Sequence, residues 1–116
     1  MNSKELLKLI LSSLEELKAQ DISTLNVGSL TDVADYMVIA TGTSNRHVGS
    51  LAEHVALEAK RSGLPALGIE GDDVSEWVLV DFGDVIVHVM QPSIRDFYDL
   101  ESLWSGLEEA KPAPME

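Results

Sequence analysis

The chain has 116 residues, the length of one domain, and it contains no cysteine, which excludes disulfide frameworks, thiol catalysis and thiolate metal sites. Its 20 acidic against 8 basic residues give a net charge of −12, and the scattered basic residues disfavour binding to naked nucleic acid, so we expect no direct DNA binding. Such acidity serves either solubility or the approach to a basic protein partner.

Apolar periodicity predicts an amphipathic helix over residues 2–19 and a short strand over residues 22–27. The continuous apolar run at 35–41 is typical of a strand that is buried on both faces. Gly42 ends that strand, and Thr43 or Ser44 is expected to cap the helix that follows. The buried stripe of this second helix is expected to consist of Val48, Leu51, Ala52, Val55 and Ala59.

The second half of the chain predicts a strand at 66–69, parallel to the strand at 35–41. A hairpin of residues 76–81 and 84–90 is expected to turn at Phe82 and Gly83, because glycine permits a positive φ. A last helix is predicted to begin at Gln91–Ser93, with Pro92 in its first position and Ser93 as a cap, and to end at Gly106.

The element order is therefore α-β-β-α-β-β-β-α, which predicts an α/β fold with a mixed sheet of about five strands flanked by helices. We expect one domain over residues 1–107 and a disordered acidic, proline-containing tail over 108–116. The first residues lack a signal-peptide pattern, and no apolar run reaches the length of a membrane span. We therefore expect a cytoplasmic protein that does not associate with membranes.

The turn at 41–47 joins a strand to a helix N-terminus, where α/β proteins often bind ligands. It carries one glycine and no Walker lysine, so it is either a capped turn or a contact surface. Ser44 and His47 lack the nucleophile-elbow motif of a hydrolase. The histidines show no zinc spacing, and the acidic loop at 70–76 is either solvated or a weak site for Ca²⁺ or Mg²⁺. We expect no catalytic residue, no bound metal and no cofactor.

Aromatic residues gather in the last third of the chain. Core packing is favoured for Phe97 and Trp104. Trp77 and Tyr98 fit the core and an interface equally well, because both residue types are enriched at interface hot spots.

Three longer segments, 34–48, 76–90 and 95–104, together with 68–71, resemble the signature of the iojap family, the bacterial ribosomal silencing factors. The resemblance covers about residues 3–106 in one order and without a large gap. It implies a nucleotidyltransferase-like α/β fold and binding to the large ribosomal subunit through ribosomal protein uL14. It also implies that joining of the small subunit is blocked, that translation is repressed when nutrients are scarce, and that the free protein forms a homodimer.

The resemblance to nucleotidyltransferases invites an enzymatic alternative. Such enzymes hold Mg²⁺ with paired carboxylates on a strand, and no Asp-x-Asp pair follows the turn at Gly42–Ser44. We therefore expect a protein that is not an enzyme. A divergent nucleotidyltransferase-like enzyme and a structural dimeric adaptor remain the alternatives.

Together with side-chain chemistry, the resemblance predicts two groups of partner-binding residues. Buried aromatic area and acceptors for partner Lys or Arg side chains define the first group, Trp77, Asp81, His88 and Tyr98. The turn before the second helix supplies the other group, Thr43, Ser44, Arg46 and His47.

Overall fold

The computed structural model describes residues 2–71 and 76–102. In this part of the chain the predicted order of elements is confirmed, with five strands in one sheet and three helices against it. The elements are α1 Ser3–Glu16, β1 Gln20–Asn26, β2 Tyr36–Thr41, α2 Asn45–Arg61, β3 Gly68–Gly71, β4 Trp77–Asp81, β5 Val85–Met90 and α3 Pro92–Tyr98.

The strands lie in the order β1-β2-β5-β4-β3. At the centre β2 and β5 pair in parallel, whereas the other neighbouring pairs are antiparallel, so the sheet is mixed as predicted. These pairings make β3 run in the same direction as β2, but β5 and β4 lie between the two. The parallel relation that the sequence predicts therefore holds without making the two strands neighbours.

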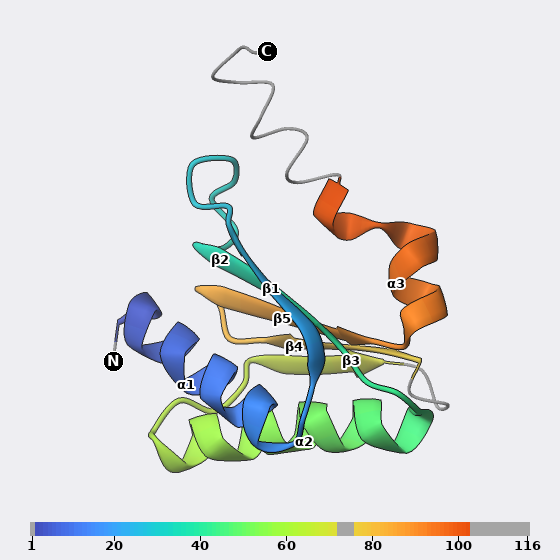
Figure 1. The fold of residues 1–116 in the computed structure, drawn as a ribbon. Coiled ribbons are helices and arrows are strands. Elements are labelled where there is room, and N and C mark those ends of the chain that lie inside the picture. The colour runs from blue at the N-terminus through green and yellow to red at the C-terminus, as the bar shows by residue number, and fades with distance from the viewer. Residues whose placement is uncertain (1, 72–75, 103–116) are drawn as a thin grey trace.

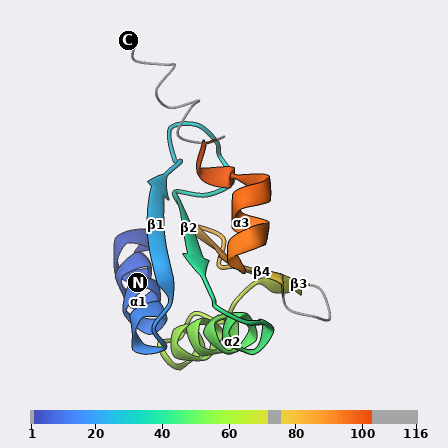
Figure 2. The same cartoon turned by 45° about the vertical axis from the view of Figure 1, so that its right-hand side comes forward.

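The sheet separates two apolar layers, with α1 and α2 on one face and α3 on the other (Figure 1). The view in Figure 2 shows the same division, with α3 on the far side of the strands from the other two helices. The larger cluster joins α1 and α2 to alternate valines of β4 and β5. The smaller one, on the α3 side, contains Val27, Ala34, Met37, Ile39 and Met90.

Local capping chemistry sets where the first two helices begin. Asn2 and Glu5 form a reciprocal capping box at α1. The Ser44 hydroxyl accepts a hydrogen bond from the His47 backbone N–H at 3.1 Å, which confirms Ser44 as the cap of α2. All five residues predicted for the buried stripe of α2 are buried.

The predicted hairpin between β4 and β5 is also confirmed. Its turn places Gly83 at φ 87°, in the left-handed region that glycine tolerates. The Asp81 carboxylate accepts a hydrogen bond from the Gly83 backbone N–H at 2.7 Å and stabilises the turn.

The last helix differs from its prediction in its cap and in its continuity. Pro92 occupies the first helical position as predicted, but the cap is Gln91 rather than Ser93. Among the described residues, the Gln91 side chain forms no hydrogen bond that caps the helix. The helix stops at Tyr98, because Asp99 adopts a left-handed conformation with φ 47°, and residues 100–102 are helical again. The predicted end at Gly106 and the predicted tail at 108–116 lie outside the described residues.

Phe97 was expected in the core, and that prediction is wrong, because its side chain is 79% exposed. Within α3 the partly buried side chains are those of Ile94 and Arg95, and Phe97 lies outside the face that they form. The left-handed Asp99 then breaks the helical spacing that the prediction assumed to continue to Leu100. Only Ile94 and Leu100 pack against the smaller cluster from this segment of the described chain. Trp104 lies outside the described residues.

Candidate partner-binding site

Three aromatic side chains, the half-buried Trp77 and the exposed Phe97 and Tyr98, lie where the start of β4 meets the end of α3; we call them the aromatic ledge. The ring centroids of Trp77 and Tyr98 are 4.8 Å apart, and those of Phe97 and Tyr98 are 5.0 Å apart with the rings edge to face. Such pairs attract each other by about 1 kcal/mol beyond their buried area. Tyr98 is 50% exposed and Phe97 more so, which is typical of an interaction surface rather than of a core.

His88 lies beneath the ledge instead of on its surface, with only 6% of its area exposed. The Trp77 indole Nε1 donates a hydrogen bond to His88 Nδ1 at 3.0 Å, and the two rings are tilted with centroids 5.8 Å apart. Burial lowers the pKa of His88 to about 4, so the imidazole is neutral near pH 7 and Nδ1 can accept this bond. His88 therefore fixes the orientation of the Trp77 ring from inside the protein.

A shallow pocket of about 280 Å³ opens beside the Trp77 ring, lined by Glu70, Gly71, Trp77 and Leu79. Its lining is more apolar than polar, and the side chain of Glu70 is exposed. An aromatic wall next to a carboxylate suits the stem and charged head of a lysine or arginine side chain.

Asp81 lies at the other end of β4 from Trp77, roughly 13 Å along the strand. Its carboxylate already accepts the Gly83 backbone N–H at the hairpin turn. The structure therefore does not bring Asp81 together with the aromatic ledge.

The second predicted group lies at the N-terminus of α2, and three of its four members make local contacts. His47 Nδ1 accepts the Thr43 backbone N–H at 2.9 Å, and His47 Nε2 donates to the Leu17 carbonyl at 2.8 Å, which links the end of α1 to this turn. Ser44 caps the helix, and Arg46 is exposed. This arrangement is that of a capped turn, with both His47 nitrogens occupied by partners other than Ser44.

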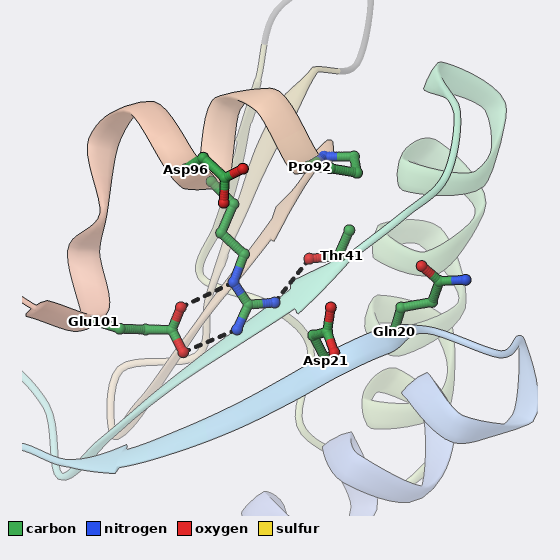
Figure 3. A pocket seen from close by; sticks show the side chains of 7 residues that line it. Gln20, Asp21, Thr41, Pro92, Asp96 and Glu101 are labelled. Carbon is green, nitrogen blue, oxygen red and sulfur yellow. Dashed lines mark hydrogen bonds and ion pairs between the residues drawn. The ribbon is translucent and has the colours of Figure 1, made fainter.

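Sequence reasoning missed a polar network beneath α3, which we call the Arg95 network. Arg95 Nε and Nη2 each donate to the Glu101 carboxylate at 2.9 Å, Nη1 donates to Thr41 Oγ1 at 2.7 Å, and Nη2 donates to Ser23 Oγ at 3.1 Å. The dashed lines in Figure 3 mark the bonds to Glu101 and Thr41. The hydrogen bond from Arg95 lowers the pKa of Glu101. The sequence did single out Arg95, because it is the sole Lys or Arg between residues 62 and 110, in a stretch that is rich in acidic residues.

The Arg95 network borders an open pocket of about 410 Å³ (Figure 3). The side chains that line it are Gln20, Asp21, Thr41, Pro92, Arg95, Asp96 and Glu101. Three of these carry carboxylates, yet no group of three or more His, Cys, Asp or Glu residues in the described ranges 2–71 and 76–102 is placed to hold a metal ion. Asp72 and Asp73, from the predicted acidic loop, lie outside those ranges. Within the same ranges no helix has the length and apolarity needed to cross a membrane.

Comparison with known proteins decides the family. The family model described as "Ribosomal silencing factor during starvation" matches residues 1–116. The chain belongs to the ribosomal silencing factor family. The resemblance to iojap proteins is thereby confirmed, and the chain is placed among proteins that silence the ribosome and regulate translation.

Curated ribosomal silencing factors match along most of their length. The chain is 47% identical over 106 residues to the factor of Chromobacterium violaceum, covering 91% of this chain and 87% of that one. It is 38% identical over 104 residues to the factor of Bacillus subtilis, covering 90% and 88%. A crystal structure of a Chromobacterium violaceum protein superimposes with a TM-score of 0.88 at 47% identity, over 90% of this chain and 88% of that one.

Proposed function

We propose that this chain binds the large ribosomal subunit through ribosomal protein uL14 and sterically blocks joining of the small subunit, which lowers translation when nutrients are scarce. Family membership supports a ribosomal partner. The observation that carries the proposal is the aromatic ledge, since it leaves Phe97 and Tyr98 largely exposed beside the half-buried Trp77. Occlusion requires only occupancy of the partner surface, so neither a cofactor nor turnover is involved.

In this proposal Trp77 and Tyr98 supply the central contact area. We add Phe97 to these contact residues because its side chain is exposed beside them. His88 contributes through its hydrogen bond to the Trp77 indole. Asp81 would accept hydrogen bonds from a partner Lys or Arg at the other end of β4. The outer contacts would come from the turn before α2, at Thr43, Ser44, Arg46 and His47.

Electrostatics supports a basic protein surface as the target. The net charge of −12 attracts a basic protein and speeds the encounter with it. Ribosomal RNA phosphates around that protein repel the same charge, so negative residues help only where they face the protein itself. A compact contact patch around the ledge meets this condition, with Glu70 beside Trp77 as its acidic member.

We also propose that free copies form a homodimer, because exposed aromatic side chains favour burial when the ribosome is absent. Pairing of copies through the ledge would then compete with ribosome binding. Sedimentation of the purified chain at several concentrations measures this directly, and a monomer at high concentration would contradict it.

Purified ribosomal subunits provide the test of the main proposal. Adding the chain should lower the yield of joined ribosomes in a sucrose gradient and should saturate near one copy per large subunit, with the chain sedimenting in the large-subunit fraction. Trp77→Ala should weaken this effect. Leu57→Ala is the matched control, because it truncates an exposed apolar side chain on α2, across the sheet from the ledge. An unchanged yield of joined ribosomes at saturating wild-type protein would contradict the proposal.

A further inference from the structure

The aromatic ledge depends on a short helix whose own residues are not fully buried. α3 has seven residues, and none of the residues Pro92–Tyr98 is fully buried. Among the described residues, its N-cap Gln91 makes no side-chain capping bond. Helices this short are not stable on their own in water, so tertiary contacts must keep α3 formed and in place. Tyr98 and Phe97 are the last two residues of this helix and carry most of the exposed aromatic area.

Apolar contacts supply only part of the attachment. Ile94 and Leu100 are partly buried against the smaller cluster and lie on either side of the break at Asp99. Contacts of this kind are non-directional, so they hold the segment on the sheet without fixing its rotation. Directional contacts are needed to place Tyr98 over one particular ring.

Arg95 supplies such directional contacts, with its side chain only 11% exposed. The guanidinium group reaches Thr41 on β2, Ser23 on β1 and Glu101 beyond the end of the helix. Its paired bonds to the Glu101 carboxylate are charge-assisted and planar, which makes them both strong and geometrically restrictive. One arginine therefore ties the helix to two strands and to the segment that follows it.

The Arg95 network and the Trp77–Tyr98 contact attach the same helix at different places. Arg95 anchors α3 over β1 and β2, whereas Tyr98 contacts Trp77 on β4, on the other side of β5. Two attachments to different strands fix both the tilt and the rotation of a short helix. Loss of the Arg95 attachment should therefore let the Tyr98 ring shift relative to Trp77, with the packing of Ile94 and the Gln91 N–H to Glu76 carbonyl bond still holding the start of the helix.

We propose that Arg95 and Glu101 are positioning residues for partner binding, which hold α3 on the sheet so that the aromatic ledge is formed before the partner arrives. This inference rests on the proposed function, because it assigns a role to residues that support its contact surface. A preformed ledge spares the complex the cost of ordering several side chains. Loss of the network should weaken partner binding although neither residue touches the partner.

Trp77 fluorescence reports on the ledge without any ribosome. Replacing Trp104 by Phe leaves Trp77 as the one tryptophan, because the sequence has two. In this background Arg95→Met should shift Trp77 emission to longer wavelength, since Tyr98 no longer shields the indole from water. Thr41→Val removes one acceptor of the guanidinium at nearly constant volume, and Thr41→Ser keeps it. We expect the valine variant to show the same shift and the serine variant to match wild type.

Binding to purified large subunits is the second measurement on the same proteins. Arg95→Met should lower affinity about tenfold, the effect of ordering one or two aromatic side chains on binding. Thr41→Val should lower it in the same direction, and Thr41→Ser should restore wild-type affinity. Should Arg95→Met fail to fold, the comparison of Thr41→Val with Thr41→Ser still tests whether the Arg95 network positions α3. An emission shift together with weaker binding, both reversed in the serine variant, supports the inference.

Three results would overturn it. Unchanged emission with lost binding means that Arg95 contacts the partner directly, and a shifted emission with wild-type affinity means that the ledge needs no preformation. Variants that match wild type in both measurements show that the network positions nothing. Failure of the wild-type chain to bind large subunits is a different result, because it overturns the proposed function and the partner role built on it, while emission still tests whether the network orders α3.

Discussion

The indole N–H of Trp77 is hydrogen-bonded to Nδ1 of His88 at 3.0 Å, so a side chain of the exposed ledge is oriented by a buried one. His88 lies on β5 opposite Leu79 of β4 and Ile39 of β2, among apolar neighbours that keep its ring neutral. This pairing connects the stability of the sheet to the geometry of the surface that we propose for partner binding. Its energetics can be measured separately from binding.

Replacing His88 by Phe should destabilise the fold by about 1–3 kcal/mol, because the Trp77 N–H loses its acceptor in a partly buried position. A double-mutant cycle with Trp77→Phe isolates the bond from the change in ring shape. Urea unfolding of the four proteins measures the coupling. Strictly additive effects of the two substitutions would show that the hydrogen bond contributes nothing to stability.

Stability should begin to fall on acidification at pH values above those at which carboxylates titrate. Burial lowers the pKa of His88 from 6.5 to about 4, so between these values the unfolded chain binds a proton that the folded chain does not. The free energy of unfolding should therefore decrease as the pH falls through this window, by about 3 kcal/mol in total. Glu101 acts in the same direction at lower pH, because its pKa is lowered in the folded state and its stabilising effect is lost on protonation.

Urea unfolding at several pH values between 7 and 4 provides the measurement for that window. His88→Phe is the control, since it has no imidazole to titrate at this position and should show a flatter dependence. Equal slopes for wild type and His88→Phe would contradict the assignment of the acid sensitivity to His88.

Phe97→Ala should separate binding from folding more cleanly than a change at any buried position. The side chain is 79% exposed and its packing within the fold is the edge-to-face contact with Tyr98, so its loss should change the free energy of unfolding by no more than about 1 kcal/mol. Within the proposed interface the same loss should weaken binding to the large subunit by about 1–2 kcal/mol. Thermal unfolding and a binding titration are measured on one preparation, with Leu57→Ala as the matched control. Wild-type affinity of Phe97→Ala would remove Phe97 from the interface.

The tight turn before α2 gives a prediction about packing. A Cβ atom on Gly42 would lie 2.7 Å from Val48 Cγ2 and 2.8 Å from the Val48 backbone nitrogen, which leaves no room for alanine. Gly42→Ala should destabilise the fold by about 1–3 kcal/mol through overpacking. Gly68→Ala is the control, because a Cβ atom added there would meet no atom within 4 Å and the φ of Gly68 is ordinary. Equal melting temperatures for the two variants would contradict this account.

Features determined by nearby residues were predictable from the sequence. The Ser44 cap and the Gly83 turn each depend on side chains within three positions, so reading a few residues was enough. The strand order and the Arg95 network depend on partners far along the chain, with Arg95 separated from Thr41 by 54 residues and from Ser23 by 72. Periodicity carries no information about such pairs.

The exposed position of Phe97 was missed for a related reason. The face of α3 that meets the sheet contains Ile94 and Arg95 but not Phe97, and the left-handed, non-glycine Asp99 ends the helix at Tyr98. The sequence therefore pointed to the aromatic residues of the last third of the chain as candidates for an interface, but it did not predict which of them are exposed.

Salt should weaken ribosome binding without abolishing it. The acidic chain meets a basic partner through exposed charges that salt screens, whereas the aromatic contacts of the ledge do not depend on ionic strength. Affinity for large subunits should thus fall as salt is raised and then level off at the apolar contribution. Asp81→Asn should reduce the salt dependence if its carboxylate faces a partner cation, while Phe97→Ala should lower affinity equally at all salt concentrations. A wild-type affinity that does not change with salt would contradict the electrostatic part of the proposal and leave the ledge as its whole basis.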